Sequence, residues 1–415
     1  MTGDALDIYV GTRLTATLER DSAAGEYVFS YCSGAQDPVS LTMPVCDLLD
    51  RFPSLPPVLE TSLPEGALLG TIFRKMGKVV KLNDDFDLLK LVGRNLIGRL
   101  VVVPSGESPE SDASFTSSDR LVSLLRSPNS KDLVTQAMVD LAERTGISGI
   151  LPKTFAMSAK KSRMAFPVGE CILKTESDEF PGICIVEHVC LAACRAADLP
   201  VPQTVLSEDG KSLLVKRFDV GPDGERRGFE DFCALSNIGR QGKYQSSYES
   251  VAKIVSLFST DPDKDSKDLF KIFAMMHLLR NGDAHLKNFG MVYPSTDNVR
   301  LSPVYDMVST TPFIPGDRPA LEYEGTRKWL RREDIVSFGM RCCGMDGKEA
   351  LSAVQECIVG IGDTIPLLTD LCDRYPIRPV LQSLLIFKDS ARSGISSVSL
   401  SGETSSDVEE PSSGT

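Results

Sequence analysis

Residues 278–288 read LLRNGDAHLKN and place a carboxylate, an imidazole, an ammonium group and a carboxamide within six positions, at Asp283, His285, Lys287 and Asn288. Burying so many polar groups in a core would be costly. The residues just upstream are instead apolar at helical spacing: Leu269, Phe270, Ile272, Phe273, Met276 and Leu279. The Asn-Gly pair at 281–282 is a helix-stop signal. The pattern therefore predicts a buried helix that ends directly before a polar loop.

Two short strands are expected after this loop, at 289–293 and 299–303, because a Pro-Ser-Thr-Asp-Asn turn separates two apolar runs. Such a hairpin can return Asp306 towards Asp283. Asn288 lies five residues after Asp283, which is the Asp-to-Asn interval of the protein-kinase catalytic loop, and Asp306 lies eighteen residues further on. The spacing indicates phosphoryl transfer, with Asp283 accepting the hydroxyl proton and with Asn288 and Asp306 as oxygen ligands of Mg²⁺.

A purely structural explanation of the polar loop is the alternative. Asp283 could cap a turn, with His285 and Asn288 as its hydrogen-bonding partners, since polar clusters are only probabilistic evidence of function. The three residues Asp283, Asn288 and Asp306 together favour catalysis more than any one of them does.

The segments 281–289, NGDAHLKNF, and 301–306, LSPVYD, resemble the paired signature of the HipA family, serine/threonine kinases that act as toxins of bacterial toxin–antitoxin pairs. Further segments similar to family motifs follow in family order: LTMP at 41–44, LPEG at 63–66, GISG at 146–149, ILK at 172–174, KRFD at 216–219, EDF at 230–232 and KY at 243–244. The resemblance covers residues 5–390. It implies an α+β, two-lobed protein-kinase-like fold with a small mixed N-terminal domain and a mainly helical C-terminal lobe.

The resemblance also implies ATP and Mg²⁺ as cofactors and a loop that faces the phosphates. Glycines let backbone amides approach phosphate oxygens closely, and the loop residues would be Gly146, Ile147, Ser148, Gly149 and Lys153. Ser148 is expected to be an autophosphorylation site whose phosphate expels the loop; alternatively, it only shapes the turn. The loop departs from the family pattern, because Gly146 stands where some family toxins have serine and Leu151 replaces a common glutamine.

Lys174 ends an apolar strand and would orient the α and β phosphates, with Glu187 on a helix at 183–197 orienting Lys174 in turn. Taken alone, a lysine at this place is usually the solvated end of a strand. Lys174→Ala is expected to weaken catalysis and to leave the fold intact. The backbone from Lys216 to Phe218 would hold adenine. His285 would brace the loop, and Lys287 would either neutralise the transferred phosphate or lie exposed.

The composition is that of an ordinary soluble globular protein, with 415 residues, 42% of them hydrophobic and 25% charged. No apolar run approaches the length of a membrane span, and residues 1–5 lack the features of a signal peptide, so a cytoplasmic protein without membrane contact is expected. The net charge of −12 argues against broad nucleic-acid binding. DNA contact is therefore expected only through a HipB-like helix-turn-helix antitoxin, which the resemblance suggests. The eleven cysteines form no paired CxxC motifs and are expected to be reduced.

Five segments are predicted along the chain. Residues 1–104 are an N-terminal domain with strands at 6–10, 14–18 and 27–31 and a helix at 86–92. Residues 105–130, rich in Ser, Glu and Pro, are a flexible linker. Residues 131–219 form the small lobe, residues 220–390 the helical large lobe, and residues 391–415 a disordered tail. Further helices are expected at 131–143, 248–258, 348–359 and 381–387.

The expected function is ATP-dependent phosphorylation of a protein serine or threonine, and the family suggests an aminoacyl-tRNA synthetase as substrate. Two other classes stay open. The first is a catalytically weak kinase-like module that acts through an antitoxin partner. The second is a metal-dependent phosphohydrolase, although the three histidines, at 188, 277 and 285, are scattered for such a site.

Overall fold

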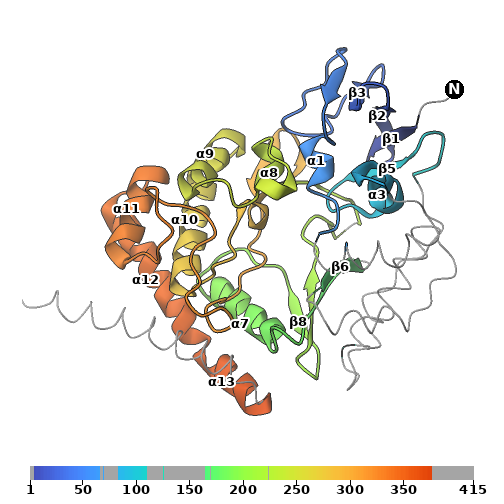
Figure 1. Cartoon of the computed structure of the whole chain (residues 1–415). Coiled ribbons are helices and arrows are strands. Elements are labelled where there is room, and N and C mark those ends of the chain that lie inside the picture. Colours follow the sequence, from blue (N-terminus) through green and yellow to red (C-terminus); the bar gives the residue numbers. More distant parts are fainter. Residues whose placement is uncertain are drawn as a thin grey trace, which may run out of the picture.

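A computed structural model describes residues 4–65, 69, 83–109, 125, 164–168, 170–222 and 224–375. The predicted phosphate-facing loop, 146–153 with Ser148, lies outside the described residues. The same holds for most of the linker, for the helices expected at 131–143 and 381–387 and for the tail. The described residues form an N-terminal domain, a small lobe built on a sheet, and a large helical lobe (Figure 1).

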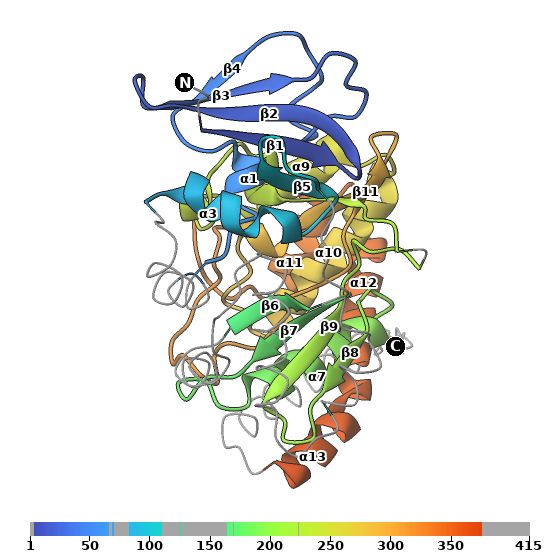
Figure 2. The same ribbon diagram turned by 90° about the vertical axis from the view of Figure 1, so that its right-hand side faces the viewer.

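The N-terminal domain is a five-stranded antiparallel sheet in the order β4-β3-β2-β1-β5 (Figure 2). Its strands are β1 Ala5–Val10, β2 Arg13–Asp21, β3 Glu26–Tyr31, β4 Asp50–Phe52 and β5 Leu100–Pro104. Among its described residues are the α-helices α1 Pro57–Glu60 and α3 Asp85–Val92. Apolar residues alternate along the strands and meet α3 in one core, which includes Leu6, Ile8, Leu18, Phe29, Phe86 and Leu89. The three strands and the helix expected in this domain are all present.

The small lobe is a four-stranded antiparallel sheet in the order β6-β7-β9-β8, with helix α7 packed beside it. The elements are β6 Met164–Val168, β7 Cys171–Thr175, β8 Thr204–Leu206, β9 Ser212–Lys216 and α7 Ile183–Ala196. Strand β7 is an interior strand, and Lys174 pairs there with Leu213 of β9. Because α7 is buried along most of its length, it can hold a side chain against this sheet.

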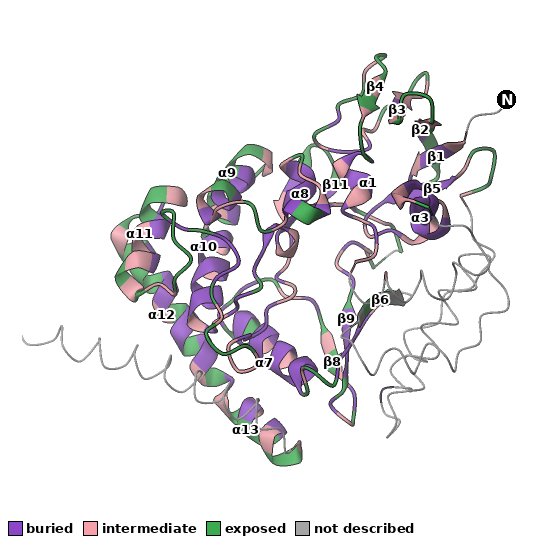
Figure 3. Ribbon diagram, viewed as in Figure 1, coloured by how far each residue is buried: buried purple, intermediate pink, exposed green. Residues whose placement is uncertain are grey.

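The large lobe is mainly helical, with a three-stranded sheet in the order β10-β11-β12. Its elements are β10 Gly228–Asp231, α8 Phe232–Leu235, α9 Tyr248–Phe258, α10 Pro262–Leu278, β11 Gly290–Ser295, β12 Asn298–Leu301, α11 Arg332–Cys342, α12 Gly347–Asp363 and α13 Ile365–Arg374. Figure 3 shows buried residues concentrated along α7 and α10. The buried helix predicted before the polar loop is α10. It ends where Arg280 adopts a left-handed φ of 58° and the Asn281 amide donates to the Met276 carbonyl at 2.9 Å.

Helices α12 and α13 give one stretch, Gly347–Arg374, that is long and apolar enough to cross a membrane by length and composition alone. Part of this stretch packs in the core, and 44% of its most apolar window is buried. Cys357, Ile358 and Ile361 are buried, and Gly360 lies so close to Ala197, at the end of α7, that an added Cβ would be 2.6 Å from the Ala197 nitrogen. Leu351 and Val359 are exposed.

The N-terminal domain docks on the large lobe through a buried carboxylate. Glu230 accepts hydrogen bonds from the Ser40 hydroxyl at 2.5 Å, the Leu41 amide at 2.8 Å and the Tyr293 hydroxyl at 2.6 Å. Burial raises the pKa of Glu230 although these three donors oppose the shift. The LTMP and EDF motifs, distant in the sequence, thus meet at one domain contact.

Candidate active site

The polar loop after α10 opens into a cleft between the two lobes and the N-terminal domain. The cleft has a volume of about 350 Å³. Its polar lining comprises Glu65, Lys243, Asp283, His285, Lys287, Asn288 and Asp306. The structure therefore brings the predicted base, the two predicted metal ligands and both uncertain residues of the loop into one place.

The backbone of the loop is held by its own side chains. The Asn288 carboxamide donates from Nδ2 to the Asp283 carbonyl at 2.8 Å, and the Asp283 amide donates to Asn281 Oδ1 at 3.1 Å. The Gly282 amide donates to the Thr310 hydroxyl at 2.8 Å. With its backbone fixed in this way, Asp283 presents a half-exposed carboxylate that accepts from the Tyr244 hydroxyl at 2.9 Å.

His285 lies on the buried side of the loop. Its Nε2 lies 3.9 Å from Asp283 Oδ1, and its ring meets the Tyr244 ring edge to face at 5.0 Å. Burial lowers the pKa of His285, more strongly than the nearby Asp283 carboxylate raises it. The imidazole is therefore neutral at pH 7. Its Nδ1 is buried without a hydrogen-bond partner among the described residues, so bracing of the loop by hydrogen bonds stays a prediction.

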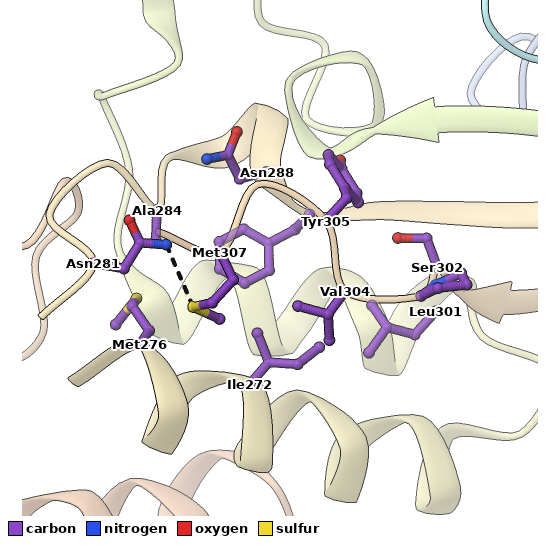
Figure 4. Close-up of a pocket in the computed structure, with 12 residues that line it drawn as sticks. Ile272, Met276, Asn281, Ala284, Asn288, Leu301, Ser302, Val304, Tyr305 and Met307 are labelled. Atoms are coloured by element: carbon purple, nitrogen blue, oxygen red, sulfur yellow. Dashed lines mark hydrogen bonds between the residues drawn. The ribbon is translucent and has the colours of Figure 1, made fainter. Parts of the chain in front are cut away.

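A small apolar pocket beneath the loop shows how the loop is supported (Figure 4). Ile272 and Met276 of α10 and Val304 line it, and Asn281 Nδ2 donates to Met307 Sδ at 3.5 Å across it. The Asn281 amide group also reaches the Asp306 carbonyl at 3.4 Å. Asn281, just after α10, is thus joined to the segment around Asp306 under the polar loop.

Lys174 connects the small lobe to this centre. Its ammonium lies 2.5 Å from Glu187 Oε1 and also forms an ion pair with Asp306. The Lys174 side chain is 7% exposed and that of Glu187 is 0% exposed. The interpretation of Lys174 as a solvated strand end is therefore wrong. Strand β7 places the ammonium inside the lobe, where α7 supplies its counter-charge.

The N-terminal domain contributes a charged group to the cleft that the sequence reading missed. Glu65, in the LPEG motif, forms ion pairs with Lys287 and with Lys243, the latter at 2.9 Å. Lys287 also donates to the Thr61 carbonyl at 2.6 Å and lies 4.0 Å from Asp231. Burial opposes ionisation of Glu65, but the two lysines outweigh it and lower its pKa. Lys287 is thus held by acidic partners and does not lie exposed.

A second, mostly apolar cavity of about 320 Å³ adjoins the cleft at Lys287 and Asp306. Its apolar lining comes from all three units and includes Val58, Leu63, Leu96, Ile97, Ile172 and Phe229. The predicted adenine contacts lie outside this lining. The Lys216 side chain is exposed and its amide donates to the Gln203 carbonyl at 2.8 Å, while the Phe218 ring packs against Phe229 and Tyr305.

The cysteines and histidines take no part in this cleft apart from His285. All eleven cysteines are among the described residues and are free thiols. His188 shares a hydrogen bond of 2.9 Å with Thr204, and His277 lies in the core, where burial lowers its pKa to about 3. Among the described residues, no group of three or more His, Cys, Asp or Glu side chains is arranged to hold a metal ion.

Comparisons with known proteins identify the family. Residues 145–365 match the HipA-like C-terminal domain, and residues 6–103 match the HipA N-terminal domain. The putative kinase Y4dM of Sinorhizobium fredii is 27% identical over 331 residues, which is 73% of this chain and 76% of that protein. A putative kinase of Haemophilus influenzae is 26% identical over 159 residues, covering 35% of this chain and 46% of the relative.

Among solved structures, the HipA–HipB–operator DNA complex of the Shewanella oneidensis MR-1 toxin–antitoxin system contains a chain similar to this one. The TM-score is 0.72 at 16% sequence identity, over 94% of this chain and 97% of the other. At this identity the likeness establishes a common fold, and the predicted α+β, two-lobed kinase-like fold is confirmed. Because the C-terminal domain alone matches over half of the sequence, the chain belongs to the HipA family.

Proposed function

We propose that this protein is an ATP-dependent serine/threonine protein kinase of the HipA type. The observation that carries the proposal is the convergence of Asp283, Asn288 and Asp306 in one cleft with the Lys174–Glu187 pair. These groups come from four separate segments of the chain, and a merely structural turn would not require them to meet. Phosphoryl transfer depends mainly on positioning and electrostatic stabilisation, which such a constellation can supply.

In the proposed mechanism, Asp283 accepts the proton of the substrate hydroxyl. The Tyr244 hydroxyl and the Asn288 carboxamide fix its side chain and its carbonyl, so the carboxylate is oriented before substrate arrives. Lys174 would hold the phosphates from the small-lobe side, and Glu187 holds its ammonium in place through the ion pair at 2.5 Å. Lys287 lines the same cleft and would neutralise charge on the transferred group.

The residues present fit ATP with Mg²⁺. Asp306 supplies carboxylate oxygens, and Asn288 offers Oδ1 because its Nδ2 is occupied by the Asp283 carbonyl. When bound, the metal would offset the negative charge of the phosphates. The apolar cavity beside Asp306 is within the size range of pockets that bury a small ligand and could take the base.

The partners remain proposals drawn from the relatives. The similar Shewanella protein was solved with HipB and operator DNA, so a HipB-like antitoxin is proposed here, with DNA contacted only through it. The net charge of −12 agrees with indirect contact. The proposed substrate is a cytoplasmic protein, with an aminoacyl-tRNA synthetase as the first to test.

The experiment is incubation of the full chain and its Asp283→Asn variant with ATP labelled at the γ-phosphate, Mg²⁺ and candidate protein substrates. Acid-stable label on serine or threonine with the wild type, lost in the variant, supports the kinase. Free phosphate without labelled protein would indicate the hydrolase, and neither product would indicate a binding module.

Autophosphorylation at Ser148 is a separate proposal that rests on the GISG motif. Intact mass after incubation with ATP, followed by peptide mapping, should place one phosphate at Ser148, with weaker nucleotide binding as the result. Active enzyme whose 146–153 peptide carries no phosphate would refute it.

A further inference from the structure

An open pocket beside the catalytic loop takes no part in the chemistry proposed above. Four cationic side chains and one indole line it: Arg280, Arg318, Arg327, Lys328 and Trp329. Three of the cations come from one segment after Asp306, and Arg280 comes from the turn that ends α10. A gathering of positive charge on a chain of net charge −12 indicates a specific anionic ligand.

Arg280 is the cation of this pocket that is half-buried, whereas those at 318, 327 and 328 are exposed. Its guanidinium stacks over the Trp329 ring at 5.1 Å from the centroid. Its backbone is fixed because the Thr310 amide donates to the Arg280 carbonyl at 3.0 Å. Within the described part of the chain no carboxylate pairs with this half-buried guanidinium, and burial lowers its pKa. A cation desolvated in this way gains stability from an anion that arrives from outside.

The other charges in the pocket leave room for such an anion. Asp317 also lines the pocket, but its carboxylate accepts from the Thr310 hydroxyl and from the Arg318 amide. Arg327 donates to the Tyr244 carbonyl at 2.8 Å and lies 3.9 Å from Glu322. The arginine and lysine side chains at 318, 327 and 328 are exposed, so they can turn towards a ligand.

The pocket shares its walls with the catalytic loop. Arg280 precedes Asp283 by three residues, and Arg327 binds the backbone of Tyr244, whose hydroxyl donates to Asp283. Asp317 packs against Gly282 so closely that a Cβ added there would meet its Oδ2 at 2.0 Å. A ligand in this pocket would therefore lie next to whatever hydroxyl Asp283 receives.

We propose that this pocket, the Arg280 pocket, binds an anionic side chain of the protein substrate, close in sequence to the acceptor serine or threonine. The carboxylate of Asp or Glu and the phosphate of phosphoserine share the required chemistry. A single anionic side chain fits better than a nucleic acid, because Asp283, Asp317 and Glu322 around the pocket repel a polyanion. The substrate part of this inference rests on the proposed kinase function.

The test is peptide binding without ATP, measured by fluorescence anisotropy. Four fluorescein-labelled probes are compared: ten-residue peptides that differ only in a central Glu, phosphoserine or Gln, and an RNA of equal length. The wild type should bind the Glu and phosphoserine peptides about tenfold or more tightly than the Gln peptide. Arg280→Gln should abolish this preference, while Arg13→Gln, which removes an equal charge at the exposed start of β2, should keep it.

Three results would overturn the proposal: equal or undetectable binding of the Glu and Gln peptides by the wild type, an unchanged preference in Arg280→Gln, or tighter binding of the RNA than of either anionic peptide. Should Arg280→Gln fail to fold, Lys328→Gln at an exposed position must weaken the preference instead. Of the Glu and phosphoserine peptides, the one that binds more tightly shows whether the pocket prefers a carboxylate or a phosphate.

Binding needs no phosphoryl transfer, so the two proposals can fail separately. If the protein prefers the anionic peptides but transfers no phosphate, the proposal for the Arg280 pocket stands and the proposed kinase function is refuted. If it transfers phosphate but shows no such preference, the kinase function stands and the proposal for the pocket is refuted.

Discussion

Replacing Lys174 with alanine should destabilise the protein as well as inactivate it. The ammonium lies 2.5 Å from Glu187, and the two side chains are 7% and 0% exposed. Removing one partner of a buried ion pair costs about 3–5 kcal/mol, because the other charge stays buried. The Asp306 side chain is 37% exposed and can be hydrated instead, so it should add little to this cost.

Urea unfolding followed by circular dichroism measures the effect. Lys174→Ala should lower the free energy of unfolding by about 3–5 kcal/mol. The double variant Lys174→Met with Glu187→Met removes both charges at similar volume and should lie within about 1 kcal/mol of the wild type. Lys216→Ala is the matched control, since this lysine also ends a strand of the same sheet but is exposed; its effect should stay within about 0.5 kcal/mol.

A Lys174→Ala variant as stable as Lys216→Ala would refute the reasoning. It would show that Glu187 is hydrated in solution and that α7 does not hold the lysine. If the double variant lost as much stability as Lys174→Ala, the loss would come from altered packing and not from an unpaired charge.

Two further predictions concern buried or half-buried carboxylates, with urea unfolding at several pH values as the measurement. Glu65→Gln should lower the free energy of unfolding by about 1 kcal/mol at neutral pH. The folded-state pKa of Glu65 lies below 4.5, so this difference in stability from the wild type should persist above pH 4.5 and disappear as the pH falls through the folded-state pKa. A difference that persists in acid would show that Lys243 and Lys287 are not its cause. For Glu230 the pH dependence of stability has the opposite direction, because its folded-state pKa is raised above 4.5. The wild type should therefore gain stability relative to Glu230→Gln as the pH falls from 7 towards 4.5. A flat difference would mean that Glu230 is ionised throughout.

The sequence predicted the elements whose signals are local. Helix α10 was found from its apolar spacing, and its end was placed within a few residues, although the actual stop is the left-handed Arg280 and not the Asn-Gly pair. Strand β5 was missed. Its Val-Val-Val run is a strand signal, but it pairs with β1 about ninety residues earlier, and such pairing depends on tertiary contacts.

The site was predicted where one segment carries several polar groups and missed where distant segments meet. Asp283, Asn288 and Asp306 could be proposed from spacing alone. Glu65 could not, because LPEG reads as an ordinary turn until the N-terminal domain docks and brings it to Lys287. The environment of Lys174 was also misjudged, since periodicity does not show that β7 lies between two other strands.

The central claim is that Asp283 and Asp306 have different roles in one active site. Calorimetry of ATP binding with Mg²⁺, alongside phosphoryl transfer, on Asp283→Asn and Asp306→Asn tests it most directly. Asp283→Asn should keep most of the ATP affinity and lose about a hundredfold to ten-thousandfold in transfer, since only the proton acceptor is removed. Asp306→Asn should lose both, because a charged metal ligand is removed. Equal loss of ATP affinity in the two variants would contradict this division, and full activity of Asp283→Asn would contradict the kinase itself.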